Sequence, residues 1–310
     1  MDNFKEMIID EINEKLGGEC NIVSNMVTKQ NDEILHSIAI VNAGERVSKN
    51  IYLESYYKEY KEGRSIDSIA EDIIGIIKCR DDMQQRCLDF AESLCDYDSV
   101  KDNLMVRLIN KDMNDKYLEN KCYVPYLDFA MLLYITNDLG IGESFSVAVT
   151  KTLQDLWKVN LDEMYSQALE NVRSKCAPTI ESMSSLIMNT FTDSHGNSIE
   201  ELEDVLNSQE ELQLYVLSNS NHINGAISMI FTDVLKSFAQ ENGVEKIIII
   251  PSSVHEVLLY PKNESDNLTE KKCLEMLLDV NATSVEQGEI LSNNIYLYNA
   301  LKDEVEIWEG

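Results

Sequence analysis

An α+β fold, with largely antiparallel sheets covered by helices, is predicted by three features of the sequence. Apolar residues recur at helical spacing in several segments, as in the stripe formed by Phe4, Ile8, Ile12 and Leu16. Runs rich in β-branched residues are separated by short polar turns, which is typical of antiparallel hairpins. Hairpin-then-helix units follow one another along 310 residues, 44% of them apolar, which is enough for a sizeable core.

The N-terminal part is predicted to hold a helical layer and a small sheet. Its expected elements are a helix over 4–16, strands over 20–29 and 33–42 around a turn at 30–32, a strand at 51–53, a tyrosine-rich helical turn and a helix over 66–77. Ser65 is placed to cap this last helix. His36 lies on the apolar face of the second strand, which favours a half-buried strand residue over a ligand.

The central part repeats the hairpin-then-helix order. Its expected elements are a helix or strand over 104–108, strands over 127–136 and 144–150, helices over 153–157 and 161–172, and a helix around 180–188. Asn160 and Glu163 have the residue types and spacing of a capping box at the start of the long helix.

The last third is expected to follow the same plan. Its predicted elements are a hairpin of strands 212–218 and 223–231, helices over 232–242 and 269–280, and strands over 246–250, 295–298 and 305–308. The units at 126–157 and 212–242 therefore echo one another in element order. The chain is divided into an N-terminal α+β region (1–97), a central hairpin-helix region (98–190), an acidic linker (191–211) and a C-terminal α+β region (212–310).

Charge is the strongest anomaly of the composition. Asp and Glu number 55 against 26 Lys and Arg, which gives a formal net charge of −29. Such a chain repels phosphate backbones and anionic lipid, so direct binding to nucleic acid or to a membrane is not expected. Between Cys176 and Leu235 there is no Lys or Arg at all.

The acidic stretch supplies the predicted partner-binding residues, which are Asp193, Glu200, Glu201, Glu203, Asp204, Glu210 and Glu211. One interpretation is a solvated acidic surface that only keeps the protein in solution. The other is a docking surface for a basic, nucleic-acid-binding protein, with carboxylates in place of phosphates.

Cysteine usage and segment hydrophobicity bear on compartment and metals. The seven cysteines are odd in number, include no CxxC pair and have no zinc-type spacing, so reduced thiols and no metal or cofactor are expected. The first segment is amphipathic and charged rather than a signal peptide, and no apolar run is long enough to cross a bilayer. A cytoplasmic protein is the expectation.

The most conspicuous motif is IIIIPSSVHEVLLYP, in which two apolar runs flank Pro251–Glu256. Pro251 is expected to end the first strand, and Ser252 or Ser253 to cap a short turn. If strands 213–218 and 246–250 are neighbours, a polar pocket forms from His222, Asn224, Ser252, Ser253, His255 and Glu256. A structural corner, a pocket and a catalytic site all remain open, and no residue is assigned as catalytic because no nucleophile elbow or HExxH motif is present.

Four segments together resemble a known family. They are YLESYYKEYKEGRSI at 52–66, NHINGA at 221–226, the IIIIPSSVHEVLLYP motif, and LLDVNATSVEQGEILSNNIYLYN at 277–299. In this order they resemble an uncharacterised domain-of-unknown-function family abundant in gut clostridia. The resemblance spans about residues 20–299. It implies a bacterial cytoplasmic protein, is compatible with carriage on mobile elements, and supplies no activity.

These observations lead to one leading hypothesis and two alternatives. The leading hypothesis is a non-enzymatic acidic protein that binds a basic protein partner, for example an anti-defence inhibitor acting by nucleic-acid mimicry. The first alternative is a small-molecule-binding or hydrolytic enzyme that uses Ser252, Ser253 and His255. The second is a housekeeping scaffold whose acidity serves only solubility.

Overall fold

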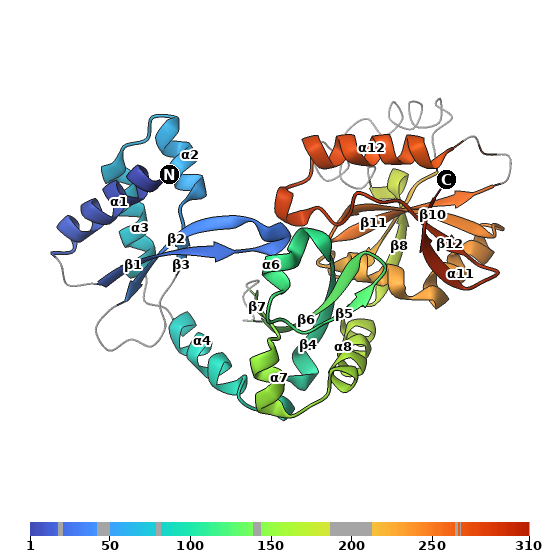
Figure 1. Cartoon of the computed structure of the whole chain (residues 1–310), viewed down its shortest axis with the longest axis horizontal. Coiled ribbons are helices and arrows are strands. Elements are labelled where there is room, and N and C mark those ends of the chain that lie inside the picture. The colour runs from blue at the N-terminus through green and yellow to red at the C-terminus, as the bar shows by residue number, and fades with distance from the viewer. Residues whose placement is uncertain are drawn as a thin grey trace.

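The described part of the chain forms three antiparallel sheets, each covered by helices (Figure 1). This architecture is seen in a computed structural model and confirms the predicted α+β class. The structure describes residues 1–17, 21–41, 50–78, 82–138, 144–186, 213–263, 266 and 268–309. The proposed linker at 191–211 lies outside these ranges, and the four-region division remains a prediction.

The N-terminal unit is a three-stranded sheet packed against helices. Its elements are α1 (Asp2–Lys15), β1 (Asn21–Thr28), β2 (Ile34–Val41), β3 (Asn50–Tyr52), α2 (Glu54–Lys61) and α3 (Ile66–Lys78). The predicted stripe of α1 is buried at Phe4, Ile8 and Ile12, where it meets Ile69 and Ile73 of α3. Ser65 Oγ accepts a hydrogen bond from the Ser68 N–H at 3.2 Å, which confirms the predicted cap.

A second sheet occupies the centre of the chain. The elements of this part are α4 (Asp82–Ser93), α5 (Tyr97–Val100), a 3₁₀ turn η2 (Lys101–Asn103), β4 (Leu104–Asn110), η3 (Asp112–Asn114), α6 (Asp115–Leu118), β5 (Tyr123–Tyr126), β6 (Phe129–Asp138), β7 (Ser144–Ala148), α7 (Lys151–Trp157) and α8 (Leu161–Lys175). Strand β6 pairs with β4 along one side and with β5 and β7 along the other. Asn160 caps α8 through the Glu163 N–H at 2.8 Å, as predicted.

The third sheet has six strands in the order β13-β12-β10-β11-β9-β8. The elements of this part are β8 (Pro178–Ser182), β9 (Tyr215–Asn219), η4 (Gly225–Ile230), α11 (Thr232–Glu241), β10 (Lys246–Ser253), β11 (Glu256–Lys262), α12 (Glu270–Thr283), η5 (Gln287–Glu289), β12 (Tyr296–Asn299) and β13 (Glu304–Ile307). Alternate residues of β10 face two different layers, since Ile248 and Ile250 pack under α12 while Ile247 and Ile249 join the large central core.

Three sequence-based expectations about this part are wrong. Segment 223–231 forms η4 instead of a strand, so 212–242 is not a hairpin-then-helix unit. The helix predicted around 180–188 is wrong over its first part, because residues 178–182 form the edge strand β8 beside β9, whereas residues 183–186 are helical. Strand β9 pairs with β11 and not with the strand that contains 246–250.

Among the helices of the described ranges, none combines the length and hydrophobicity required to span a bilayer.

Candidate functional site

The Pro251–Glu256 corner is the tight turn of the β10–β11 hairpin. Pro251 does not end the strand as predicted, because β10 continues through it to Ser253 and Pro251 pairs with Val257. A register shift between Pro251 and Ser253 gives the irregularity that lets a proline sit within a strand. Only Val254 and His255 lie between the two strands, and Glu256 pairs with Ser253.

His255 is held on both ring nitrogens. Its Nδ1 accepts a hydrogen bond from the Asn224 N–H at 3.1 Å, and its Nε2 lies 3.4 Å from Glu289 Oε1. Because Nδ1 accepts, the neutral ring carries its proton on Nε2, the nitrogen nearer to Glu289. No nitrogen of this ring is left to act as a general base toward a serine hydroxyl.

The main-chain groups of His255 are also held by hydrogen bonds. Its carbonyl oxygen accepts from Ser218 Oγ at 2.8 Å, and its N–H donates to Ser253 Oγ at 3.1 Å. Gly225 passes so close that an added Cβ would lie 2.6 Å from the His255 carbonyl oxygen. This close packing of the turn against β9 and η4 makes the corner a structural joint.

The structure brings only some of the predicted pocket residues together. Asn224 and Ser253 each form a hydrogen bond with His255, Asn224 to its ring and Ser253 to its main-chain N–H, and Glu256 pairs with Ser253 across the hairpin. His222 is exposed at a backbone φ of 53°, which is typical of a turn residue. The partner-binding carboxylates Asp193, Glu200, Glu201, Glu203, Asp204, Glu210 and Glu211 lie outside the described residues.

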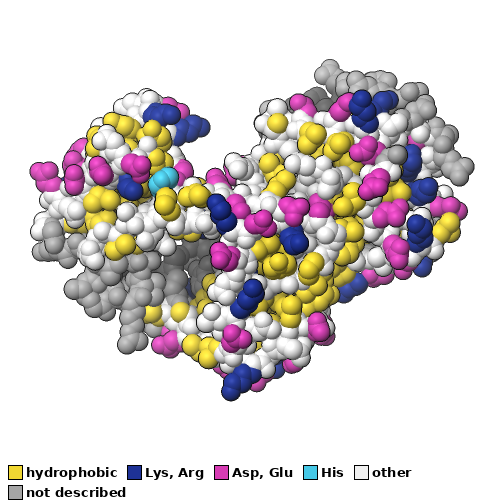
Figure 2. All heavy atoms as spheres, viewed as in Figure 1, with side chains coloured by type: hydrophobic (Ala, Val, Ile, Leu, Met, Phe, Trp, Pro, Cys, Tyr) yellow, Lys and Arg dark blue, Asp and Glu magenta, His cyan; other side chains and the backbone are white. Residues whose placement is uncertain are grey.

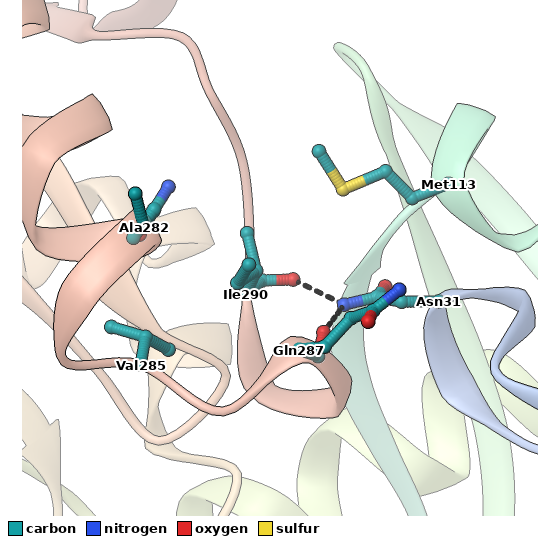
Figure 3. A pocket seen from close by; sticks show the side chains of 7 residues that line it. Asn31, Met113, Ala282, Val285, Gln287 and Ile290 are labelled. Atoms are coloured by element: carbon teal, nitrogen blue, oxygen red, sulfur yellow. Dashed lines mark hydrogen bonds between the residues drawn. The ribbon is translucent and has the colours of Figure 1, made fainter.

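The Pro251–Glu256 corner also contacts Glu289, which lies in the η5 segment beside a cavity. The Glu289 carbonyl oxygen accepts from the Val254 N–H at 3.0 Å, so the hairpin turn positions the η5 segment. Beside η5 lies a cavity of about 530 Å³, named here the junction cavity. It is lined by Asn31, Met113, Asn281, Ala282, Val285, Gln287 and Ile290 (Figure 3).

One wall of the junction cavity is the hairpin tip Gln30–Asp32, which forms the turn η1 between β1 and β2. Asn31 Nδ2 donates to the carbonyl oxygens of Gln287 at 2.6 Å and Ile290 at 2.9 Å, as Figure 3 shows. Gln30 Nε2 donates to the Gly288 carbonyl oxygen at 2.8 Å. The tip of the N-terminal unit is thus joined to the C-terminal part by hydrogen bonds to three main-chain carbonyls.

The same tip is joined to the central part. The Asn31 N–H donates to Asn114 Oδ1 at 2.6 Å, and Asn114 Nδ2 returns a bond to Asn31 Oδ1 at 2.7 Å. Asp32 accepts from the N–H groups of Lys116 and Tyr117 at the start of α6. Asn31 and Asp32 have positive φ, which asparagine and aspartate tolerate better than most residues.

A buried polar network continues from the tip behind the cavity. Asn114 donates to the Asn110 carbonyl oxygen, and Asn110 Nδ2 lies 3.4 Å from Asp128. Asp128 also accepts from Ser292 at 2.9 Å and from Tyr296 at 2.7 Å. Desolvation, with the nearby Asp128 charge, raises the pKa of the Tyr296 phenol far above its ordinary value, so this phenol remains a donor.

The turn at 30–32 is evident from the sequence, but its role is not. Nothing in a turn composition of Gln, Asn and Asp says that the turn docks on residues about 250 positions away. The available signal is the resemblance, because segment 277–299 supplies Asn281, Gln287 and Ile290 to the cavity. Segments 221–226 and 251–256 meet this segment through the Asn224–His255–Glu289 contacts.

The described residues contain no group of three or more His, Cys, Asp or Glu side chains able to hold a metal. Within the same ranges, free cysteines are exposed at Cys95 and buried at Cys122, Cys176 and Cys273. Burial raises the pKa of the three buried thiols, which makes them poor nucleophiles at neutral pH.

This difference predicts the order of thiol alkylation. Native protein treated with iodoacetamide at pH 7.5 is expected to be labelled at Cys95 well before Cys122, Cys176 or Cys273. Peptide mass spectrometry over time measures the order, and labelling in 6 M urea is the control in which all four react. Equal rates in the native protein would contradict the described burial.

The protein has an α+β fold in which the Pro251–Glu256 corner and the junction cavity are connected through η5. Its described residues hold no assembled catalytic constellation. The chain belongs to a family of unknown function (DUF5688), whose model matches residues 1–300. No curated protein and no solved structure matches the chain.

Proposed function

We propose that the protein is a non-enzymatic, cytoplasmic acidic protein that binds a basic, nucleic-acid-binding protein. The observation that carries the proposal is the excess of 55 carboxylates over 26 basic side chains. A charge of −29 attracts a positively charged partner over roughly the Debye length, about 8 Å at physiological ionic strength. An anti-defence inhibitor that occupies a nucleic-acid channel is the specific form of this function.

One acidic row within the described surface supports the proposal. Asp2, Glu6, Asp10 and Glu14 are all exposed and recur every fourth residue along α1. Four residues of helix rise about 6 Å, so the row presents regularly spaced negative charge. Figure 2 shows acidic side chains over the N-terminal unit together with some basic ones, and acidic and basic side chains interspersed over the rest of this face.

The corner geometry weighs against the hydrolytic alternative. Both ring nitrogens of His255 already contact Asn224 and Glu289. The two serine hydroxyls that contact His255, Ser218 Oγ and Ser253 Oγ, bond to its main chain and not to its ring. A triad requires an imidazole nitrogen free to accept the proton of the nucleophile. We therefore assign His255 to positioning of the η5 segment rather than to chemistry.

The test is capture of partners on immobilised protein at 50 mM and 500 mM salt. A basic partner is expected to bind at low salt and to be released at high salt. The Glu6→Lys/Asp10→Lys variant is expected to capture much less of this partner at low salt. Reversal of Glu200, Glu201, Glu203 and Asp204 to Lys tests the acidic stretch in the same way.

The matched control is Glu241→Lys/Glu245→Lys, which changes charge equally at two exposed positions at the end of α11 and beyond it. Capture by this variant is expected to remain close to that of the unmodified protein. If no salt-sensitive basic partner is captured, or if all reversals act alike, the acidic scaffold is the better account. Ser252→Ala/Ser253→Ala is expected to leave capture unchanged.

A further inference from the structure

The junction cavity has the position and size of a ligand site. Its volume of about 530 Å³ falls within the roughly 300–1,000 Å³ that small-molecule sites occupy. Its walls come from three separate parts of the chain, namely the hairpin tip, η3 and the α12–η5 segment. Binding sites occur preferentially at such interfaces between structural units.

The lining specifies the charge of a ligand. Four apolar side chains, Met113, Ala282, Val285 and Ile290, share the cavity with three neutral amides. No charged side chain lines it, so an ionised group entering the cavity would lose water without gaining a counter-charge. A ligand that matches this lining is therefore uncharged and has an apolar body.

The amide side chains of the lining determine which hydrogen bonds a ligand can make in the cavity. Asn281 is 7% exposed and donates through Nδ2 to Ser292 O at 3.1 Å and Asn293 Oδ1 at 3.0 Å. Its Oδ1 is buried and accepts no hydrogen bond from the described residues. Because its Nδ2 is used within the protein and its Oδ1 is buried, Asn281 forms a fixed part of the wall and offers no hydrogen bond to a ligand.

The second amide, that of Gln287, remains available to bond to a ligand. Its carbonyl oxygen is used by Asn31, whereas its side chain is exposed and makes no hydrogen bond to the described residues. Asparagine and glutamine amides pair well with ring edges that carry a donor next to an acceptor, as adenine does. The thioether of Met113 also favours contact with an aromatic ring.

We propose that the junction cavity binds an uncharged nitrogen heterocycle of the size of a nucleoside. The apolar walls contact the ring faces, and the exposed amide of Gln287 pairs with its polar edge. Since the cavity is walled by both the hairpin tip and the 282–290 segment, the ligand also strengthens the joint between the N-terminal unit and the rest. The site is independent of the acidic partner surface.

Titration with adenosine, guanosine and uridine, followed by calorimetry and by amide chemical shifts, tests the proposal. At least one nucleoside is expected to bind saturably and to shift the amides of Asn31 and Gln287. The corresponding nucleoside monophosphate is expected to bind more weakly, because the cavity offers its phosphate no cation. Absence of saturable binding by all three nucleosides, or tighter binding of the monophosphate, would overturn the proposal.

Two variants locate the binding site. Gln287→Ala is expected to weaken binding by about tenfold, which corresponds to one lost hydrogen bond of about 1.4 kcal/mol. Ala282→Trp fills the cavity from an exposed helical position and is expected to abolish binding. Gln240→Ala, an equally exposed glutamine on α11, is the matched control and is expected to bind normally. Unchanged binding in both cavity variants would overturn the assignment.

Discussion

Replacing Gly225 with alanine is expected to lower the free energy of unfolding by about 3 kcal/mol, at the upper end of the cost of overpacking. The added Cβ would lie 2.2 Å from Ser218 Oγ, 2.6 Å from the His255 carbonyl oxygen and 2.7 Å from the Asn219 nitrogen. Two of these atoms belong to the backbone, and Ser218 Oγ is itself held by His255. The turn cannot move away without breaking contacts on both sides.

Urea denaturation followed by circular dichroism measures the effect. Gly75→Ala is the matched control, because Gly75 lies inside α3 and an added Cβ there meets nothing within 4 Å. This control is expected to stabilise the protein by about 0.5–1 kcal/mol through helix propensity. An unchanged urea midpoint for Gly225→Ala would show that the corner is not packed as described.

Replacing Asn114 with alanine is expected to cost about 3 kcal/mol, since it leaves two or more buried polar groups without partners. Asn114 is fully buried, receives the Asn31 N–H and donates to Asn31 Oδ1 and the Asn110 carbonyl oxygen. All three bonds disappear in the variant. The hairpin tip is therefore expected to detach more readily from the central part.

Urea denaturation also measures this loss, with hydrogen exchange of residues 30–32 as a local readout. The control is Asn25→Ala, because Asn25 is exposed on β1 and its side chain makes no hydrogen bond to the described residues. A surface change of this kind is expected to stay within about 0.5 kcal/mol. If Asn114→Ala behaves like Asn25→Ala, the polar junction contributes little to stability.

Local patterns predicted much of the fold because they depend on neighbours in the chain. The stripe of α1, the Ser65 and Asn160 caps and the turn at 30–32 are all set by residues a few positions apart. The buried run of β10 was also recognised, apart from its extension through Pro251.

The errors arose where tertiary contacts override local preference. Segment 223–231 is an apolar run, and periodicity cannot separate a buried strand from a buried helical turn. It becomes η4 because Gly225 must approach Ser218 and His255 closely. Residues 178–182 become a strand only because β9 lies beside them, about 35 positions later in the chain.

Several residues that meet at the corner were predicted from the sequence, but their spatial arrangement was not. Asn224, Ser253 and His255 do meet, yet they brace η5 instead of lining the cavity beside it. The cavity depends on Asn31, Met113 and Gln287, whose sequence separations exceed any local pattern. Only a structure could place them together.

The central structural claim is that the hairpin tip, the central part and η5 form one polar junction. Its most direct test is the hydrogen-exchange rate of the Asn31 amide in the intact protein, because this N–H donates to the buried Asn114 side chain at 2.6 Å. The account predicts protection similar to that of the β10 amides, and its loss in Asn114→Ala. Exchange as fast as that of an exposed turn in the unmodified protein would contradict it.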